Sequence, residues 1–304
     1  MAKAKFVAAL AVALIATVGF TGSVQADTRR DDNGDRGQSF EAHLEHFPNQ
    51  DLVRGEASAL RTATTNNLTY HNGPIMGGTV TVRPIYWGPS WANSAFVGDK
   101  ATGLATFYSQ YRGSNYAGIQ TQYGQTNGTK TSKIITVAAS FTDTSAASSV
   151  TTDVLNKVVS TIGFANLNTS DYYPVYTDIA RGTNGFCAWH SAGAVTQNGV
   201  TKSLKFAFFF NLDGDAGCDP KDPRVVYSQG TESLVNVTSH ELAEALTDPQ
   251  LNAWYDRNGY ENGDKCAWKF NPANADGSVL LTPTASYAWK LQGEWDNATS
   301  ACKW

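Results

Sequence analysis

The chain has few charged residues and no excess of positive charge. Lys, Arg, Asp and Glu together make up 16% of its 304 residues, and the formal net charge is -4. Proteins that bind nucleic acid or an anionic membrane surface through electrostatics carry a basic patch or a basic excess. The composition therefore predicts neither a nucleic-acid partner nor attachment to an anionic membrane.

The chain also lacks a long apolar run beyond its first residues. The early run, Phe6–Phe20, is too short to span a bilayer comfortably. It follows Lys3 and Lys5 and precedes the sequence VQA that ends at Ala26. A positive start, an apolar centre and small residues at a cleavage site are the three parts of a secretory signal peptide. We predict cleavage after Ala26 and a secreted, extracellular protein without membrane attachment; a retained N-terminal anchor is the alternative.

Two common catalytic motifs are missing. The chain contains no G-x-S-x-G, the turn that carries the nucleophilic serine of many hydrolases. It also contains no glycine-rich phosphate loop following a strand. The sequence therefore favours neither a serine hydrolase of that type nor a nucleotide-binding enzyme.

Cysteine is rare, but its number is informative. The four cysteines are Cys187, Cys218, Cys266 and Cys302. An even number in an exported chain predicts two disulfides, for which three pairings exist. We favour Cys187–Cys218 and Cys266–Cys302, which close successive loops; free buried thiols are the alternative.

The chain divides into three parts. Residues 1–26 form the predicted signal peptide. Residues 27–69 begin with the charged sequence DTRRDDNGDRGQ, which has no apolar side chain, so we predict a partly disordered linker or pro-region. Residues 70–304 contain the predicted secreted domain, and their length suits a single domain.

Within that domain, segments typical of strands and of helices alternate without a strict rhythm. Strands are expected over 77–88, 132–141, 174–180, 186–193 and 204–211, and helices over 94–111, 151–162 and 231–247. Pro84 predicts an edge position or a bulge in the first strand. We predict an α/β fold of the α+β type, with a mixed sheet and one long helix that carries the active site.

The segment SHELAEALTDP, residues 239–249, carries the most chemistry. On a helix, His240 and Glu244 project from one face and can bind one metal ion. Glu241 is adjacent and can act as general base toward a water that the metal activates, as in H-E-x-x-H metallopeptidases. Glu replaces the second histidine here, and a carboxylate is an ordinary zinc ligand. We predict zinc; a surface helix with a solvated His-Glu-Glu face is the alternative.

A zinc site needs a third protein ligand and an open position. The downstream sequence ENGDKC offers Asp264 and then Glu261, and Asp248 is a weaker candidate. These carboxylates could instead belong to a turn without a ligand role. His190 is a further candidate, as a ligand, as an oxyanion stabiliser or as a structural histidine.

A second acidic segment, LDGDAGCDPKDP, could hold calcium. Its carboxylates are those of Asp213, Asp215, Asp219 and Asp222. Carboxylate oxygens are ordinary calcium ligands, but the spacing does not match the EF-hand loop.

Two family resemblances follow from these motifs. The sequences YHNGPIMGGTVTVRPIYWG (70–88), GFC (185–187) and KFAFFFN (205–211) resemble the EXORDIUM or phosphate-induced family of secreted proteins. That resemblance implies an extracellular protein without an established enzyme activity. The sequences SHELAEALTDP (239–249) and ENGDKC (261–266) resemble secreted bacterial proteins of the zincin-type metallopeptidases. This second resemblance implies His240 and Glu244 as ligands and Glu241 as base, on an H-E-x-x-E motif.

The sequence thus leaves two functions open. The first is a secreted zinc hydrolase, peptidase-like, that acts on a protein or peptide. The second is a non-catalytic extracellular protein that binds a cell-surface partner or polysaccharide. For the second, aromatic rings near the C-terminus could stack on sugars: Trp268, Tyr287, Trp289 and Trp295.

Overall fold

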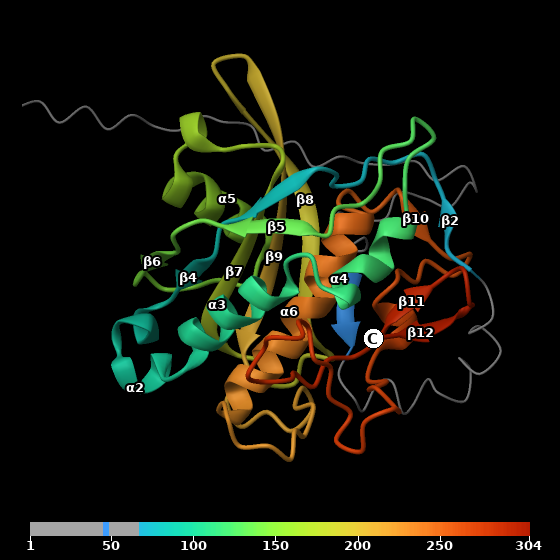
Figure 1. Ribbon diagram of the computed structural model, residues 1–304. Helices are drawn as coiled ribbons and strands as arrows, with labels where there is room; N and C mark the ends of the chain where they lie inside the picture. Colours follow the sequence, from blue (N-terminus) through green and yellow to red (C-terminus); the bar gives the residue numbers. More distant parts are fainter. Residues whose placement is uncertain (1–44, 49–66) are drawn as a thin grey trace, which may run out of the picture.

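The computed structural model describes residues 45–48 and 67–304 (Figure 1). The predicted signal peptide, 1–26, lies outside the described residues, as does most of the predicted linker or pro-region, 27–69. None of the described helices is long and apolar enough to cross a membrane.

A mixed eight-stranded sheet forms the centre of the fold (Figure 1). Its strands are β1 (Glu45–Pro48), β3 (Thr79–Val82), β4 (Ile85–Trp87), β5 (Ile134–Val137), β6 (Phe141–Asp143), β7 (Asp171–Ala180), β8 (Phe186–Gln197) and β9 (Val200–Asn211). The strand order is β1-β8-β9-β7-β3-β5; in addition, β4 pairs with β7, and β6 pairs with β4. β8 is antiparallel to β1 and β9, whereas the other pairs are parallel. The predicted α/β class with a mixed sheet is confirmed.

Helices and two small ladders complete the fold. The helices are α2 (Ser94–Val97), α3 (Lys100–Tyr111), α4 (Asn115–Ile119), α5 (Thr151–Ile162) and α6 (Gln229–Thr247). The two-stranded ladders pair β2 (Thr69–Tyr70) with β10 (Trp254–Tyr255) and β11 (Glu294–Asp296) with β12 (Ala301–Lys303). α6 packs on β8 and β9 and also contacts β1 and α3.

Three expected elements are interrupted in the structure. The strand expected over 77–88 is broken into β3 and β4 next to Pro84, which cannot donate a backbone hydrogen bond. The helix expected over 94–111 is two helices, because Gly98 has a φ of 49° that ends α2. The strand expected over 132–141 is likewise two short strands, β5 and β6. The helix over 151–162 is confirmed at both ends as α5.

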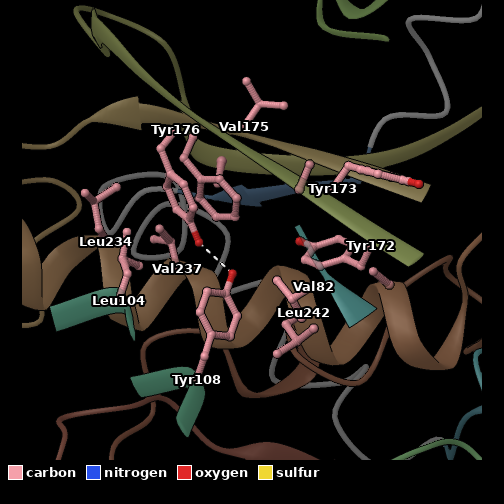
Figure 2. Close-up of a cluster of buried hydrophobic side chains, with 14 of the residues drawn as sticks. Val82, Leu104, Tyr108, Tyr172, Tyr173, Val175, Tyr176, Leu234, Val237 and Leu242 are labelled. Carbon is pink, nitrogen blue, oxygen red and sulfur yellow. Dashed lines mark hydrogen bonds between the residues drawn. The ribbon is translucent and has the colours of Figure 1, made fainter. Parts of the chain in front are cut away.

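Aromatic and aliphatic side chains fill the space between α6 and the sheet (Figure 2). The hydroxyls of Tyr108 on α3 and Tyr176 on β7 hydrogen bond at 2.7 Å, which satisfies both phenols inside the core. Leu234 and Val237 of α6 belong to the same cluster. The core therefore holds the helix in a fixed orientation on the sheet.

α6 is buried along almost its whole length. Every residue after Gln229 is buried. The helix begins at Ser228, whose side-chain oxygen accepts a hydrogen bond from the Thr231 backbone N–H, and it ends before Pro249. The alternative of a surface helix with a solvated polar face is therefore wrong, and the polar groups on α6 need partners inside the protein.

Glu232, in the first turn of α6, makes the stability dependent on pH. Burial raises the pKa of Glu232 to about 7, while the Tyr287 hydroxyl donates a hydrogen bond to its carboxylate. Since this pKa lies above the unfolded value, the folded state binds a proton more tightly. The contribution of Glu232 to the free energy of unfolding is then fully present below about pH 4.5 and is lost as the pH rises through about 7.

We expect Glu232→Gln to remove this loss. Between pH 4.5 and pH 8, the unsubstituted protein should lose up to about 3 kcal/mol in free energy of unfolding through Glu232, and the variant should not show this loss. Urea unfolding at both pH values measures the difference. An identical pH dependence in the two proteins would contradict the assignment to Glu232.

Candidate metal centre

Three ionisable side chains of α6 form one side of the candidate site. His240, Glu241 and Glu244 are each 0% exposed. His240 Nε2 lies 3.0 Å from Glu244 Oε2, as expected for side chains one helical turn apart. The predicted pair on one helix face is therefore present, and it points into the protein rather than to solvent.

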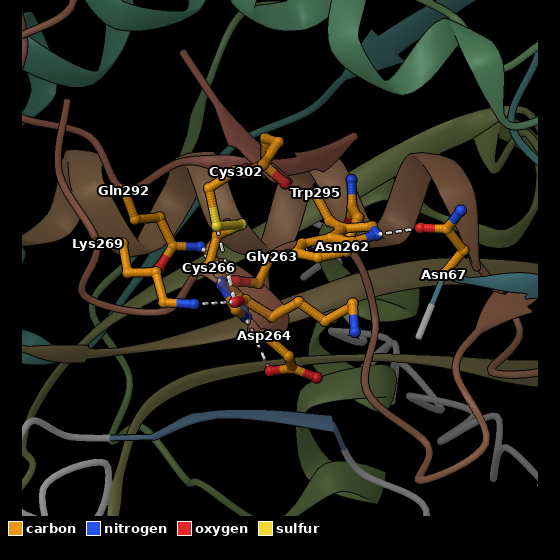
Figure 3. The surroundings of a disulfide bond; sticks show 12 residues. Asn67, Asn262, Gly263, Asp264, Cys266, Lys269, Gln292, Trp295 and Cys302 are labelled. Atoms are coloured by element: carbon orange, nitrogen blue, oxygen red, sulfur yellow. Dashed lines mark hydrogen bonds and ion pairs between the residues drawn. A yellow bond between two sulfur atoms is a disulfide. The ribbon is translucent and has the colours of Figure 1, made fainter. Parts of the chain in front are cut away.

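The loop after α6 supplies the third member of the group. Asp264 Oδ1 lies 3.7 Å from His240 Nε2, and the Asp264 backbone N–H donates to Glu244 Oε1 at 3.0 Å. Gly263 allows this close approach, because a Cβ there would lie 2.6 Å from His240 Nδ1. The Cys266–Cys302 disulfide ties this loop to β12 (Figure 3). Both favoured disulfide pairings are confirmed.

The spacing of these three side chains fits a small divalent cation. One ligand atom from each of His240, Glu244 and Asp264 lies within 4.8 Å of the others. Ligands about 2.0–2.2 Å from a tetrahedral zinc are separated by about 3.3–3.6 Å. The separations of 3.0 Å and 3.7 Å bracket that range. Glu244 Oε2 is buried and lies 3.0 Å from His240 Nε2 and 3.6 Å from His190 Nδ1, without the geometry of a hydrogen bond to either.

Burial also sets the protonation states in this group. It lowers the pKa of His240 to about 4, so the imidazole is neutral near pH 7 and can act as a ligand. Burial raises the pKa of Glu244, and burial together with the neighbouring Glu244 carboxylate raises the pKa of Asp264 to about 8. Two acidic groups buried this close together are stabilised by a cation between them.

His190 of β8 lies close to three glutamate side chains. Its Nδ1 is 3.2 Å from Glu241 Oε2 and 3.6 Å from Glu244 Oε2, and its Nε2 is 3.6 Å from Glu261 Oε2. His190, Glu241 and Glu244 thus form a second group with ligand spacing, which shares Glu244 with the first. Glu261, predicted as a ligand, lies next to His190, and neither group includes it. His190 belongs to the site, whichever of its expected roles it has.

The remaining ligand candidate has a structural role. Asp248 Oδ1 accepts hydrogen bonds from the backbone N–H groups of Asn252 and Ala253, at 2.5 Å and 2.7 Å. Asp248 therefore shapes the turn that follows α6, and neither ligand group includes it.

Carboxylates of the acidic segment considered for calcium form ion pairs with lysine and arginine side chains. Asp215 forms an ion pair with Arg181, Asp222 with Arg224, and Asp213 with the lysine that begins α3. Among the residues with a described position, this segment contributes no group with ligand spacing. The structure gives calcium no support, and it stays an untested prediction.

Sequence reasoning missed Gln292. Its Nε2 lies 2.5 Å from His240 Nδ1 and 3.2 Å from the Gly263 carbonyl oxygen, while its backbone N–H donates to Asn236 of α6. Gln292 thereby contacts the His240 ring at Nδ1, whereas Glu244 lies at Nε2. Nothing in the local sequence LQGEWDN distinguishes this glutamine, since only the fold brings the C-terminal segment to α6.

The small size of Gly263 should be a requirement of the site. In Gly263→Ala, the new Cβ would also lie 2.9 Å from Glu244 Oε1, so the loop or the ligands must shift. We expect about a 10-fold to 100-fold loss in metal affinity, as seen when groups that orient ligands are disturbed. Competition with a chromogenic chelator measures the affinity.

Gly118→Ala is the matched control for this prediction. Gly118 lies in α4 with nothing within 4 Å of a new Cβ. We expect its metal affinity to equal that of the unsubstituted protein. Equal affinities for Gly263→Ala and Gly118→Ala would show that the close approach at Gly263 does not matter.

The site must be interpreted from its own geometry. The chain was compared with protein-family models, with curated proteins and with solved structures, and none of them matches. The resemblances to the EXORDIUM family and to zincin-type metallopeptidases stay predictions.

Proposed function

We propose that the protein is a metal-dependent hydrolase, with zinc as the cation and a protein or peptide as the substrate. The convergence of His240, Glu244 and Asp264 within ligand distance carries the proposal. The three residues come from a helix and from a loop twenty residues further on, and a disulfide next to Asp264 holds the loop. Imidazole nitrogen and carboxylate oxygen are both ordinary zinc ligands.

The residues around the ligands have the chemistry for water activation. Zinc bound there would supply a Lewis acid that polarises a carbonyl and lowers the pKa of a water. Glu241 follows His240 on the helix, and its carboxylate can take a proton from that water as general base. His190 contacts Glu241 Oε2 at 3.2 Å and so limits its side-chain orientation.

Gln292 would orient the metal-binding imidazole. An imidazole that binds a metal through Nε2 carries its hydrogen on Nδ1 and donates it to a neighbouring acceptor. Rotation of the Gln292 amide by 180° would place its Oε1 toward His240 Nδ1 at the 2.5 Å contact, and would give up the 3.2 Å hydrogen bond that Nε2 donates to the Gly263 carbonyl. Gln292 would then fix both the tautomer and the orientation of the ring.

The polysaccharide alternative has less support from the structure. Tyr287, Trp289 and Trp295, which could have stacked on sugars, are buried at 8%, 0% and 3% exposure. Trp289 belongs to the main core, where Tyr227 stacks on it at 4.9 Å. These three rings stabilise the fold and offer no binding surface, whereas the fourth ring, Trp268, is only partly buried. The two disulfides fit the oxidising compartment of a secreted protein, and secretion is part of the proposal.

Hydrolysis of an unfolded protein substrate tests this function. Zinc-loaded protein should produce new N-termini, and both a strong chelator and Glu241→Gln should stop the reaction. Full activity in the presence of the chelator would contradict the proposed role of the metal.

A further inference from the structure

The side chains of the candidate site are closed off from solvent. His190, His240, Glu241 and Glu244 are all 0% exposed, and Glu261 is 1% exposed. A hydrolase must bring the scissile bond of its substrate to the metal and to the general base. On the proposed function, the described conformation is a closed form, and part of the chain must move before a substrate enters.

β1 lies beside the strand and the helix that carry the site. It is the last strand of the sheet, pairs antiparallel with β8 and contacts α6 (Figure 1). Glu45 is in register with His190, and His46 with Trp189. A four-residue stretch of extended backbone thus runs along the edge of the strand that carries His190, next to the helix that carries the proposed ligands.

β8 does not depend on β1 for its place in the fold. It pairs with β9 from Ala188 to Gln197, and the disulfide from Cys187 to Cys218 anchors it. All four cysteines follow residue 186, so no disulfide ties β1 to the sheet. β1 has four residues, and its pairing is already irregular between Phe47 and Pro48. β8 therefore has attachments to the fold that do not involve β1.

Without β1, β8 would present an edge of unpaired N–H and C=O groups beside the site. Such an edge binds extended peptides by adding them as a further strand, with main-chain hydrogen bonds as the main attraction. We propose that the edge of β8 at Phe186–His190 binds the extended backbone of the peptide substrate, and that β1 occupies this edge as a competing intramolecular inhibitor, which slows hydrolysis without abolishing it. The substrate assignment rests on the proposed function, whereas the occupation of the edge does not.

The test uses proline to remove backbone donors from β1. Neighbouring residues of a strand alternate in which N–H faces the partner, so Glu45→Pro/His46→Pro removes at least one donor toward β8. The matched control, Glu45→Ala/His46→Ala, changes the same side chains and keeps the donors. The readout is acylation of His190 and His240 by diethyl pyrocarbonate in metal-free full chain, followed by mass spectrometry.

We expect acylation of both histidines to be about tenfold faster in the proline variant, and unchanged in the alanine variant, because only the first weakens strand pairing. A synthetic peptide of residues 44–49, added to the proline variant, should restore protection. Equal rates in both variants, or no protection by the peptide at millimolar concentration, would overturn the proposal. If the double proline variant does not fold, His46→Pro and Phe47→Pro repeat the test singly.

This experiment is independent of metal and of turnover. A protein that binds no zinc but shows the expected acylation pattern would contradict the proposed function and leave the occupation of the edge standing. A zinc-loaded protein whose proline and alanine variants hydrolyse peptides at equal rates would support the metal centre and overturn inhibition by β1.

Discussion

Glu241→Gln protein should keep its metal and lose about 10²–10⁴-fold in the turnover number for peptide hydrolysis. Glutamine has nearly the same shape as glutamate, so the buried position on α6 is retained, but an amide cannot take a proton from water. Because Glu241 is not part of the group formed by His240, Glu244 and Asp264, the metal should remain bound. Steady-state kinetics and metal content, measured on the same samples, test both statements.

Glu232→Gln is the control for this prediction. It makes the same chemical change on the same buried helix, and the side chain of Glu232 contacts Tyr287 rather than the candidate site. We expect its turnover to match that of the unsubstituted protein at a pH where both are folded. Loss of metal in Glu241→Gln would contradict the role of base, and would instead assign Glu241 to the second ligand group with His190.

Loss of the Cys266–Cys302 disulfide should have the second large effect. The bond joins residues 36 positions apart, and the loop-entropy relation gives a contribution of about 4 kcal/mol to the free energy of unfolding. Cys266 closes the short 3₁₀ helix that begins at Asp264, so we also expect weaker metal binding in Cys266→Ala/Cys302→Ala. Urea unfolding and chelator competition measure the two effects.

The other disulfide provides the comparison. Cys187→Ala/Cys218→Ala removes a bond of similar span, 31 positions, and should cost a similar free energy of unfolding. Neither cysteine lies next to a proposed ligand, so metal affinity should fall less than in Cys266→Ala/Cys302→Ala. Equal losses of affinity in the two double variants would show that the Cys266–Cys302 bond has no particular role at the site.

Local patterns were enough to predict the elements that carry the site. The spacing of His240 and Glu244 and the apolar residues around them predicted a helix with both groups on one face, and the structure has that helix. Likewise, Asp264 was expected near them because ENGDKC combines acidic residues with a disulfide cysteine. These signals are short-range, and the structure brings the three residues together.

The parts that could not be predicted depend on contacts between distant segments. Glu261 precedes Asp264 by three residues, yet it faces His190 because the loop turns between them. Gln292 reaches His240 only through the packing of the C-terminal segment on α6. The pairing of β1 with β8 joins segments about 140 residues apart, and a four-residue strand has too little periodicity to be recognised.

The metal content of the purified protein tests the central claim most directly. The unsubstituted protein and a His240→Ala/Glu244→Ala variant would be analysed by inductively coupled plasma mass spectrometry, before and after incubation with zinc. We predict close to one zinc per chain in the first and none in the second. No bound metal in the unsubstituted protein, even after zinc is added, would contradict the metal centre and with it the proposed hydrolase.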